Sequence, residues 1–568
     1  MKTLNLHVDY IEWEGLKKAL KSMDDLPEEE TKKTKVKEAL VVMTAVEKND
    51  SMEMISEYLD NIKTIASQVG AKNVVLYPYA HLSSDLGKPE LAVEFLKTAE
   101  EKLAADGVNV FRAPFGYYKA FKLRVKGHPL SELSRNIVIS GNEEKVQDIS
   151  DKEREKLVRE ISKSKLDTSK LAENDHRIIG KKMDLWSFNP VAPGMIFWHD
   201  KGLHIKNKLV EYWREIHREA GYQEISTPQI MDRKLWEISG HWSKYGENNF
   251  KTGYEGRDFL VKPMNCPGGM LVYKTSPKTY KDLPLKMGEI GLVHRVELSG
   301  VLSGLFRVIQ FNQDDAHIFC TEEQLEDEIV KIIDLVENIR TTFGLEFDHV
   351  ELSTRPEKRI GREELWDLAE SSLEKVLKHQ KMNFVVNEGD GAFYGPKIDF
   401  HLKDSLGRTW QCATIQLDMA LPERFDLEYQ DTEGKMQRPI MLHRVVYGSL
   451  ERFIGMITEN YNGNFPLWIN PNQVKVMTVG EKSEEFAKEV YDRLFKEGFR
   501  VELDSRDESI GKKVREASIE RFCYMLTLGE DEAEEKIVAV KKNGSKDIQK
   551  MKLNDFIDSM KEEIISKK

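Results

Sequence analysis

The chain has 568 residues, 40% of them hydrophobic and 32% charged, and its formal net charge at pH 7 is -12. At roughly 100 to 200 residues per domain, this length predicts about three or four domains, each able to bury its own core. The composition is that of an ordinary soluble protein: it excludes a membrane-spanning segment and argues against indiscriminate binding of nucleic acid, while it permits a local basic face and an RNA partner.

Residues 1 to about 140 alternate between strand-like and helix-like segments. The first stretch, MKTLNLHVDYIEWEG, carries acids and alternates polar with apolar residues, which is unlike an export signal. EALVVMTAV, NVVLYPYAH and VNVFRAPFGYYKAFKLRV predict strands, and the segments that begin at Ser51 and Lys88 predict helices. We therefore predict a compact α/β domain.

Residues 141–182 are rich in charge and poor in aromatic side chains, which predicts a solvated helical linker. Residues 183–465 follow, with long amphipathic helices. One of them, HIKNKLVEYWREIHREAG, ends at Gly221 and leads into YQEISTP, a strand that Pro228 stops.

The longest helix predicted in this central part is TEEQLEDEIVKIIDLVENIRTTFG. Thr321 and Gln324 predict a capping box, and Gly344 stands where a C-cap is expected. One apolar stripe runs from Leu325 to Ile339, so we predict that this helix belongs to the scaffold and carries no functional site.

Residues 466–568 alternate strongly again. VKVMTVG, FRVELDS, CYMLTLG and KIVAVKK predict strands, and the segments that begin at Ser483 and Ile510 predict helices. This order predicts a second α/β domain with a parallel sheet.

The cysteines are too few and too widely spaced for a disulfide framework or a CxxC metal site; they are Cys266, Cys320, Cys412 and Cys523. They predict reduced thiols and a cytoplasmic protein. Cys266, in KPMNCPGGM, is either a buried structural thiol or a ligand. With His317 in QFNQDDAHIFC and His443 in MLHRVVYGS it forms a three-ligand zinc set with a fourth position open for a substrate, but the spacing leaves both interpretations open.

Three arginines form a second signal. Arg295 and Arg307 flank a loop with two glycines, in a strand-loop-strand pattern that predicts either a clamp for a polyphosphate or a surface hairpin with salt bridges. Arg452, beside Glu451 on an apolar helix, is costly to bury without a ligand or partner. No GxxxxGK[ST] and no GxGxxG after a strand occur, so a nucleotide would be bound by arginine side chains on an antiparallel sheet.

YQEISTP, HRVELSG to FRVIQF, and GSLERFIG resemble the three motifs of class II aminoacyl-tRNA synthetases. NCPG, QDDAHIF, WQCATIQLD and LHRVVYGSLERFIG are similar to threonyl-tRNA synthetases, over residues 174 to 568. YAHLSS, PFGYYKAF and GHPLSELSR resemble the archaeal-type editing domain of that family, which is related in fold to D-aminoacyl-tRNA deacylases.

The resemblance implies a multidomain α+β and α/β fold. The expected parts are an editing domain (1–140), a charged helical linker (141–182), a class II catalytic domain with an antiparallel sheet (183–465) and an anticodon-binding domain (466–568). It also implies a homodimer with threonine, ATP and tRNA-Thr as ligands.

By the same resemblance, Cys266, His317 and His443 hold a zinc ion that takes the amine and hydroxyl of threonine. Such a site rejects valine, because the ion would lack a ligand, but serine differs only by a methyl, worth roughly 1 to 3 kcal/mol. An editing site is therefore expected. The threonine pocket would be lined by Met264, Gln313, Asp315, Tyr394 and Gln416.

The implied ATP site uses Arg295 on the α-phosphate, Arg307 and Arg452 on the outer phosphates, Glu297 and Phe311 on adenine, and Gln411 and Thr414 near the ribose. The threonine carboxylate would attack the α-phosphorus with Mg²⁺ and the arginines stabilising the charge, and no protein nucleophile is needed. His241, in SGHW, either assists activation or transfer or is structural.

For the editing domain, the resemblance points to His81, Tyr118, Lys119 and Glu132 as the site that hydrolyses Ser-tRNA-Thr. Lys119 would place a cation by the scissile ester, and His81 and Glu132 would order a water. Each of the four could instead be a hydrogen-bonded core or rim residue.

In the last domain, RDESIGKKVREASIERF predicts a basic face for the anticodon stem, with Arg506, Lys512, Lys513, Arg515 and Arg521. The sequence departs from the bacterial enzymes in having Gly269 in place of a histidine, Lys541 to Asn543 in place of several arginines, and no HxxxH editing motif before residue 190.

Two alternatives stay open. One is another class II enzyme, a seryl or prolyl synthetase, which the thiol-and-imidazole set and the editing-like domain disfavour. The other is a synthetase-like RNA-binding protein without the chemistry, which has no need of three arginines placed to hold a polyphosphate.

Overall fold

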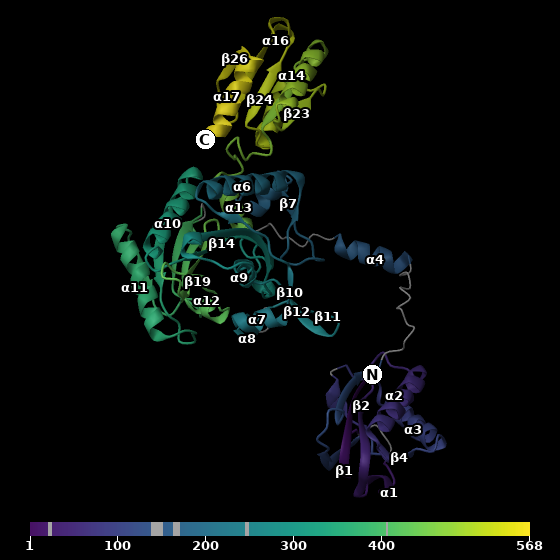
Figure 1. Cartoon of the computed structure of the whole chain (residues 1–568). Coiled ribbons are helices and arrows are strands. Elements are labelled where there is room, and N and C mark those ends of the chain that lie inside the picture. The colour runs from purple at the N-terminus through teal and green to yellow at the C-terminus, as the bar shows by residue number, and fades with distance from the viewer. Residues whose placement is uncertain are drawn as a thin grey trace. The chain divides into compact units, whose positions relative to one another are not determined.

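The computed structural model describes residues 1–20, 25–83, 85–137, 151–162, 171–244, 249–404 and 407–567. The chain divides into two compact units, Met1–Ser150 and Asp151–Lys568, which are drawn in Figure 1. The predicted multidomain α+β and α/β fold is confirmed. Among the described residues, no helix has both the length and the apolar character needed to cross a bilayer.

The first unit is a mixed sheet in the order β4-β3-β2-β1-β5, with β6 paired to β1. Its strands are β1 (Lys2–Lys18), β2 (Thr34–Ala45), β3 (Asn73–Pro78), β4 (Asn109–Arg112), β5 (Tyr117–Val125) and β6 (Glu132–Asn136), and its helices α1 (Glu28–Thr31), α2 (Ile55–Val69) and α3 (Pro89–Ala105). Apolar side chains alternate along β2, so that Leu40 and Val42 pack under α2 and α3 while Val41 and Met43 enter a second cluster on the other face.

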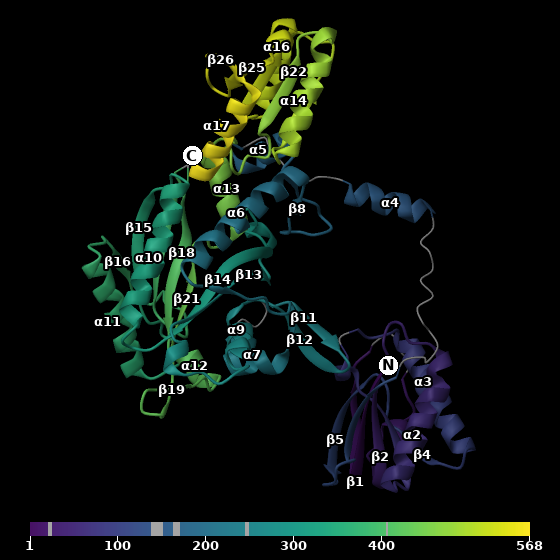
Figure 2. The same ribbon diagram turned by 45° about the horizontal axis from the view of Figure 1, so that its top comes forward.

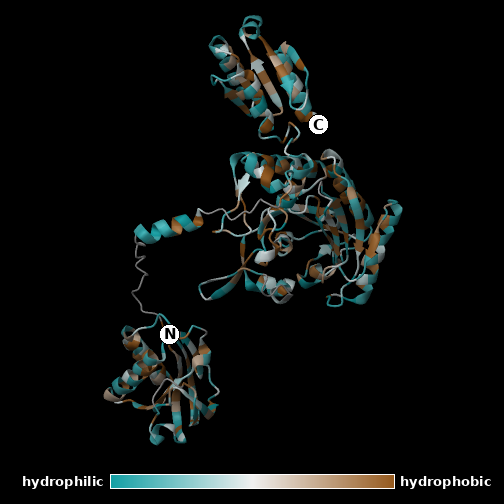
Figure 3. Cartoon of the chain, turned by 180° about the vertical axis from the view of Figure 1, so that it is seen from behind, coloured by the Kyte–Doolittle hydropathy of each residue, from teal (hydrophilic) through white to brown (hydrophobic). Residues whose placement is uncertain are grey.

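Residues expected in the linker behave in two ways. Helix α4 (Asp151–Ile161) is exposed and mixes charged residues with exposed Leu157, Val158 and Ile161, as Figure 3 shows by teal and brown segments. Helix α5 (His176–Lys182) is instead packed on α13, with His176 and Ile179 buried. Residues 141–150 and 163–170 lie outside the described residues.

The second unit is built on an eight-stranded sheet, in the order β16-β15-β17-β18-β21-β14-β13-β9. The strands are β9 (Gln223–Glu224), β13 (Leu285–His294), β14 (Gln310–Cys320), β15 (Phe347–Ser353), β16 (Val385–Asn387), β17 (Lys397–Lys403), β18 (Thr409–Asp418) and β21 (Ile440–Val445). The predicted antiparallel sheet is confirmed for the five pairs from β15 to β13, and the outermost pairs, β15 with β16 and β13 with β9, are parallel.

Long helices cover one face of this sheet (Figure 2). They are α6 (Asp200–Glu219), α10 (Leu325–Thr342), α11 (Glu363–His379) and α13 (Leu450–Asn460). The stripe predicted on α10 is buried. Gln324 caps the turn before α10 by accepting the Thr321 N–H at 3.1 Å. The two-residue β9 is much shorter than the strand expected before Pro228.

The other face carries shorter elements, and the side chains that the alternation of the strands leaves on this face include His317 and His443. These elements are α7 (Arg233–Ser239), α8 (His241–Lys244), α9 (Cys266–Tyr273) and α12 (Ala420–Arg424), the three-stranded sheet of β10 (Ile230–Asp232), β12 (Arg257–Val261) and β11 (Lys251–Tyr254), and the β19–β20 pair (Tyr429–Gln430, Met436–Gln437). A further pair, β7 (Trp186–Ser187) and β8 (Phe197–Trp198), lies beside α5 and α6.

The C-terminal part has a five-stranded sheet in the order β23-β22-β24-β25-β26. Its elements are β22 (Val474–Thr478), α14 (Glu484–Lys496), β23 (Val501–Asp504), α15 (Ile510–Ile519), β24 (Tyr524–Leu528), α16 (Glu530–Glu535), β25 (Ile537–Lys542), β26 (Ile548–Lys552) and α17 (Leu553–Ser566). The prediction of a parallel sheet is right for β22, β23 and β24 and wrong for β25 and β26, which join antiparallel. Short connections explain this, because a parallel crossover needs a dozen or more residues.

Candidate functional site

The thiol and the two imidazoles singled out in the sequence meet on one face of the eight-stranded sheet. This is the face that carries the shorter elements, and it is called the open face below. His317 and His443 are cross-strand neighbours on β14 and β21, and Cys266 is the first residue of α9. One ligand atom from each of the three residues lies within 4.8 Å of the other two, and all three are buried. The structure thus brings together residues that are up to 177 positions apart in the sequence.

The surroundings of the three residues fit a zinc ion. Asp418 Oδ2 lies 2.8 Å from His443 Nε2, the kind of carboxylate contact that orients a ligating imidazole. The buried Nε2 of His317 finds no hydrogen-bond partner among the described residues. Burial, together with the carboxylates of Asp315 and Asp418, raises the pKa of the Cys266 thiol, so a cation beside it is needed to hold the thiolate. A mixed nitrogen and sulfur donor set suits zinc.

The residues expected to line the amino-acid pocket lie around this cluster. Gln416 is the cross-strand neighbour of His443 on β18, and the Tyr394 ring lies 5.3 Å from the His443 ring. Asp315, two residues before His317 on β14, accepts a hydrogen bond from Asn265 Nδ2 at 3.2 Å. Gln313 lies on the same face of β14.

Arg295 follows β13 directly and points back over the sheet. Its guanidinium donates to the Pro263 carbonyl at 3.2 Å and to Met264 Sδ at 3.0 Å, and lies 5.2 Å from the centre of the Phe311 ring. These contacts tie Arg295 to the loop that carries Cys266. An arginine so placed is preorganised beside the amino-acid pocket.

Arg307 and Glu297 lie on the two sides of the loop between β13 and β14. Their side chains form an ion pair at 3.0 Å, and Arg307 is 52% exposed. At that exposure the pair adds little to stability and can open to a ligand. A surface hairpin with salt bridges was one of the two sequence interpretations, and this pair alone is consistent with it.

Arg452 sits in the first turn of α13 and reaches the sheet. It donates to the carbonyls of Phe306 and Gln411, both at 3.0 Å, and its guanidinium lies 5.5 Å from the Trp410 ring. Its neighbour Glu451 is buried and accepts from Lys206 Nζ at 3.1 Å and from the Asn312 N–H at 2.8 Å. Glu451 and Arg452 were predicted to be costly to bury, and each of the two charges has its own partners.

Gln411 and Thr414 are held by a carboxylate that the sequence analysis missed. Asp399, on β17, accepts from Gln411 Nε2 at 2.6 Å and from Thr414 Oγ1 at 2.8 Å, and forms an ion pair with Lys397 at 2.7 Å. The signal that could have revealed it is an acid inside KIDFHLK, a strand whose neighbouring positions are apolar.

A second missed residue anchors the loop that carries Arg307. His176 of α5 is fully buried, accepts the Leu305 N–H at Nε2 (3.0 Å), and contacts Glu459 Oε1 through Nδ1 (2.7 Å). Glu459 in turn pairs with Arg408 at 2.7 Å. Because the sequence analysis assigned His176 to a solvated linker, nothing in that interpretation pointed to this role.

His241 is buried at the start of α8. Its Nδ1 lies 2.8 Å from Ser239 Oγ, and its ring lies 6.3 Å from the Tyr394 ring. Burial, with the positive charge of nearby groups, lowers its pKa to about 3, so the imidazole is neutral near pH 7. His241 lies close to the cluster of Cys266, His317 and His443, and its position is compatible with both a catalytic and a structural role.

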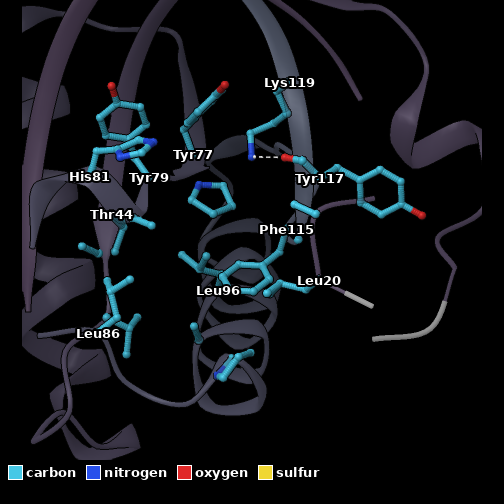
Figure 4. A pocket seen from close by; sticks show the side chains of 18 of the residues that line it. Leu20, Thr44, Tyr77, Tyr79, His81, Leu86, Leu96, Phe115, Tyr117 and Lys119 are labelled. Atoms are coloured by element: carbon cyan, nitrogen blue, oxygen red, sulfur yellow. Dashed lines mark hydrogen bonds between the residues drawn. The ribbon is translucent and has the colours of Figure 1, made fainter. Parts of the chain in front are cut away.

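In the first unit, three of the four residues expected in a hydrolytic site line one cavity of about 510 Å³: His81, Tyr118 and Lys119. Figure 4 shows Lys119 pointing into it from β5 and His81 beside Tyr79. Lys119 Nζ donates to the Pro114 carbonyl at 3.0 Å and lies 5.1 Å from the Tyr77 ring. Burial lowers its pKa to about 8.

Glu132 is not among the residues that line this cavity. It is exposed on β6, opposite Leu6 of β1, whereas Lys119 lies opposite Gly15 near the other end of the same strand. Within the unit as described, Glu132 therefore stays a prediction without a geometric link to the other three.

The basic face expected in the C-terminal part is largely neutralised. Lys513 is buried and donates to the Thr478 carbonyl at 2.9 Å, so the expectation that it faces RNA is wrong. Arg506 forms ion pairs with Asp504 and Glu516, and Lys512 pairs with Glu508. Arg515 and Arg521 remain candidates for an RNA contact.

Three family models match the chain. They are the archaea-specific editing domain of threonyl-tRNA synthetase at residues 1–137, the tRNA synthetase class II core domain (G, H, P, S and T) at 250–461, and an anticodon binding domain at 473–563.

Sequence relatives and a solved structure agree with these matches. The threonine–tRNA ligase of Carboxydothermus hydrogenoformans is 52% identical over 394 residues, covering 69% of this chain and 62% of that protein. The ligase of Caldanaerobacter subterraneus is 53% identical over 393 residues (69% and 61%), so the chain spans about 60% of the length of these relatives. A crystal structure titled as the RNA binding domain of threonyl-tRNA synthetase from Cryptosporidium parvum is 40% identical with a TM-score of 0.67, covering 68% of this chain and 98% of that one.

Proposed function

Because the chain belongs to the threonyl-tRNA synthetase family, we propose that it is a threonine–tRNA ligase that also edits. It activates threonine with ATP, transfers the threonyl group to tRNA-Thr, and hydrolyses mischarged Ser-tRNA-Thr in its first unit. The observation that carries the proposal is the convergence of Cys266, His317 and His443 within 4.8 Å of one another on the same sheet face as Asp399 and its partners.

In the activation step, the threonine carboxylate attacks the α-phosphorus of ATP and pyrophosphate leaves. Arg295, held by the Pro263 carbonyl and by Met264, neutralises charge at the α-phosphate. Arg452 and Arg307 bind the outer phosphates. The exposed ion pair between Arg307 and Glu297 opens, and Arg307 then pairs with the substrate. Glu297 is then available to accept from the adenine amino group, and Phe311 offers its ring for stacking.

The ribose side of the site rests on Asp399. It fixes the amide of Gln411 and the hydroxyl of Thr414, so both groups are oriented before ATP arrives. Positioning of this kind supplies much of the rate in a reaction without a protein nucleophile. Mg²⁺ accompanies ATP and shares the neutralisation of its phosphates.

Cys266, His317 and His443 are the residues that would hold zinc. Zinc held there would act as a Lewis acid that binds the amine and hydroxyl of threonine. Asp418 keeps the His443 ring in place, and Gln416 and Tyr394 close the pocket around the amino acid. Gln313, Asp315 and Met264 complete its wall. His241, neutral at working pH, would assist activation or transfer through its neighbours in this pocket.

Editing uses the cavity of the first unit. Serine passes the first site because it differs from threonine by one methyl, which is worth roughly 1 to 3 kcal/mol of discrimination. Lys119, charged below pH 8, stabilises the oxyanion that forms when the ester is cleaved, and His81 orders the water. Tyr118, 65% exposed, would meet the tRNA end; Glu132, which does not line the cavity, stays a prediction.

Family membership also suggests a homodimer, which would work in the cytoplasm. The domain boundaries would lie near residues 140, 182 and 465. The C-terminal part would read the anticodon, with Arg515 and Arg521 near the backbone of the stem.

The test is ATP–pyrophosphate exchange with a panel of threonine, serine, valine and proline, followed by charging of tRNA-Thr. Threonine should support the fastest exchange, serine a slower one, and valine and proline background rates. Preferred activation of serine or proline, with serine or proline charged stably, would assign the chain to a neighbouring enzyme. No exchange with any of the four would favour the RNA-binding alternative.

A further inference from the structure

A second cluster of side chains of the kinds that bind metals lies on the same sheet face, on β15 and β17. His349 of β15 and His401 of β17 are directly opposed across the antiparallel pair. Their rings are stacked, with centroids 4.3 Å apart and planes at 8°. Glu351, two residues along β15, lies on the same face as His349.

The three side chains bring their possible ligand atoms close together. One ligand atom from each lies within 4.8 Å of the other two. His349 Nε2 is 3.0 Å from Glu351 Oε1, and His401 Nε2 is 3.5 Å from Glu351 Oε2. Zinc bonds of about 2.0 to 2.2 Å in a tetrahedron place two ligands about 3.3 to 3.6 Å apart. The His401 contact has this spacing, whereas the His349 contact, to the other oxygen of Glu351, is shorter and has the length of a hydrogen bond.

Neighbouring side chains contact two of the three residues, His349 and Glu351. Asp348 Oδ2 contacts His349 Nδ1 at 3.0 Å, which leaves Nε2 toward the cluster, and Asp348 is itself fixed by Thr409 Oγ1 at 2.8 Å. Asn387 Nδ2 donates to Glu351 Oε2 at 3.0 Å. A carboxylate behind a histidine and an amide on a ligating carboxylate are typical of the residues that surround metal ligands.

An ion pair of a protonated His349 with its two acids is the competing explanation. It accounts for His349, but the buried Nε2 of His401 makes no hydrogen bond to any described residue, and its contact with Glu351 is 3.5 Å long. A buried ring nitrogen without a partner is costly. A cation held by both rings satisfies that nitrogen, and the two rings must tilt out of their stack for both lone pairs to meet one ion.

Backbone irregularities bracket the cluster. The β15–β17 pairing shifts register between Phe347 and His349, and the β17–β18 pairing shifts between Phe400 and His401. Bulges re-aim side chains and are common beside functional sites. Here each one immediately precedes a histidine of the cluster.

We propose that His349, Glu351 and His401 form a second metal site, which takes a zinc-class divalent transition ion with water in the remaining position. Two imidazoles and one carboxylate favour zinc, cobalt or nickel over magnesium or calcium. The ion fastens β15 to β17 next to Asp399, whose carboxylate has an oxygen within 4.8 Å of a Glu351 oxygen. The site does not depend on the proposed function or on metal binding at Cys266.

Cobalt titration of the full-length, metal-stripped protein tests the proposal. Cobalt bound by the Cys266 cluster gives a thiolate charge-transfer band, whereas cobalt bound by His349, Glu351 and His401 adds visible absorption without that band. At a cobalt concentration that just saturates the wild type, the wild type should hold one more equivalent than His401→Gln and Glu351→Gln, because each variant should bind that equivalent at least tenfold more weakly. His379→Asn, an exposed histidine at the end of α11, is the matched control and should behave as the wild type.

The readout is a difference between proteins, so it stands whether or not the Cys266 cluster is filled. Circular dichroism checks the folding of each variant, and if one of the two does not fold, the other decides. The same cobalt capacity in the wild type and the folded variants overturns the proposal. An equal loss in His379→Asn overturns it as well, because the ion would then be bound at the surface.

Discussion

The open face of the eight-stranded sheet and the cavity of the first unit hold their polar groups differently. On the sheet, buried carboxylates orient the site: Asp418 contacts His443, and Asp399 holds Gln411. In the cavity, Lys119 is held by a main-chain carbonyl and an aromatic ring, and Tyr118 is 65% exposed. Fixed charges suit phosphoryl transfer, where stabilisation depends on preorganisation. The cavity of the first unit, with an exposed tyrosine among its lining residues, suits the end of a large substrate that is selected by its shape.

The largest effect is expected for a change to the site on the sheet. Arg295→Ala removes the guanidinium beside the Cys266 loop and should lower threonine-dependent ATP–pyrophosphate exchange by roughly 10²- to 10³-fold, while deacylation of Ser-tRNA-Thr is unchanged. Arg493→Ala, an exposed arginine of α14, is the control. Near-normal exchange in Arg295→Ala would remove this arginine from the mechanism.

The reciprocal change acts on the cavity. Lys119→Ala removes the partly buried cation and should slow hydrolysis of Ser-tRNA-Thr by roughly 10²-fold, with ATP–pyrophosphate exchange at the wild-type rate. Lys122→Ala, an exposed lysine on the same strand, should leave both rates intact. If Lys119→Ala deacylates normally, the hydrolytic site lies elsewhere.

A subtler change tests how the sheet orients its ligands. Asp418→Asn keeps the size of the side chain and an oxygen for the N–H groups of Ala420 and Leu421, but it replaces the carboxylate behind His443. Zinc affinity, measured by competition with a chelator, should fall by roughly 10- to 100-fold. Exchange at saturating zinc should largely recover. Unchanged affinity would mean that Asp418 does not orient a zinc ligand.

The pH dependence of editing sharpens the role of Lys119. Because burial lowers its pKa from the ordinary 10.5 to about 8, the folded protein loses this cation as the pH rises through about 8. Enzymatic deacylation, corrected for spontaneous hydrolysis, should therefore fall by about tenfold per pH unit above that value. A rate that rises through pH 8 would instead assign Lys119 as a base.

The smallest effect concerns the loop anchor. His176→Asn should cost about 1 to 3 kcal/mol of folding free energy, because the buried Leu305 N–H and Glu459 lose their shared partner. It should raise KM for ATP several-fold with little change in kcat, since the loop is displaced but its arginine is intact. An unchanged KM in a folded variant would separate α5 from ATP binding.

The sequence predicted the elements well where patterns are local. The stripe on α10 and the strands of both α/β parts follow from periodicity and caps. The antiparallel return of β25 and β26 was missed because their pairing depends on connection length more than on hydrophobic pattern.

Residue type and spacing singled out Cys266 and the arginines but left a structural thiol and a surface hairpin open, and their expected roles came from the family resemblance. The supporting residues of the site were not predictable, because Asp399, Asp418 and His176 act through partners that only the pairing of distant strands and helices brings near. Likewise, Lys513 looked like part of a basic face until its burial against Thr478 was known.

Zinc back-titration of metal-stripped protein tests the central claim most directly. Threonine-dependent ATP–pyrophosphate exchange should be lost on stripping and should return with zinc in the wild type but not in Cys266→Ala. Full threonine-selective exchange in the stripped protein, or its recovery in Cys266→Ala, would contradict the proposal that Cys266, His317 and His443 hold the ion that selects the amino acid.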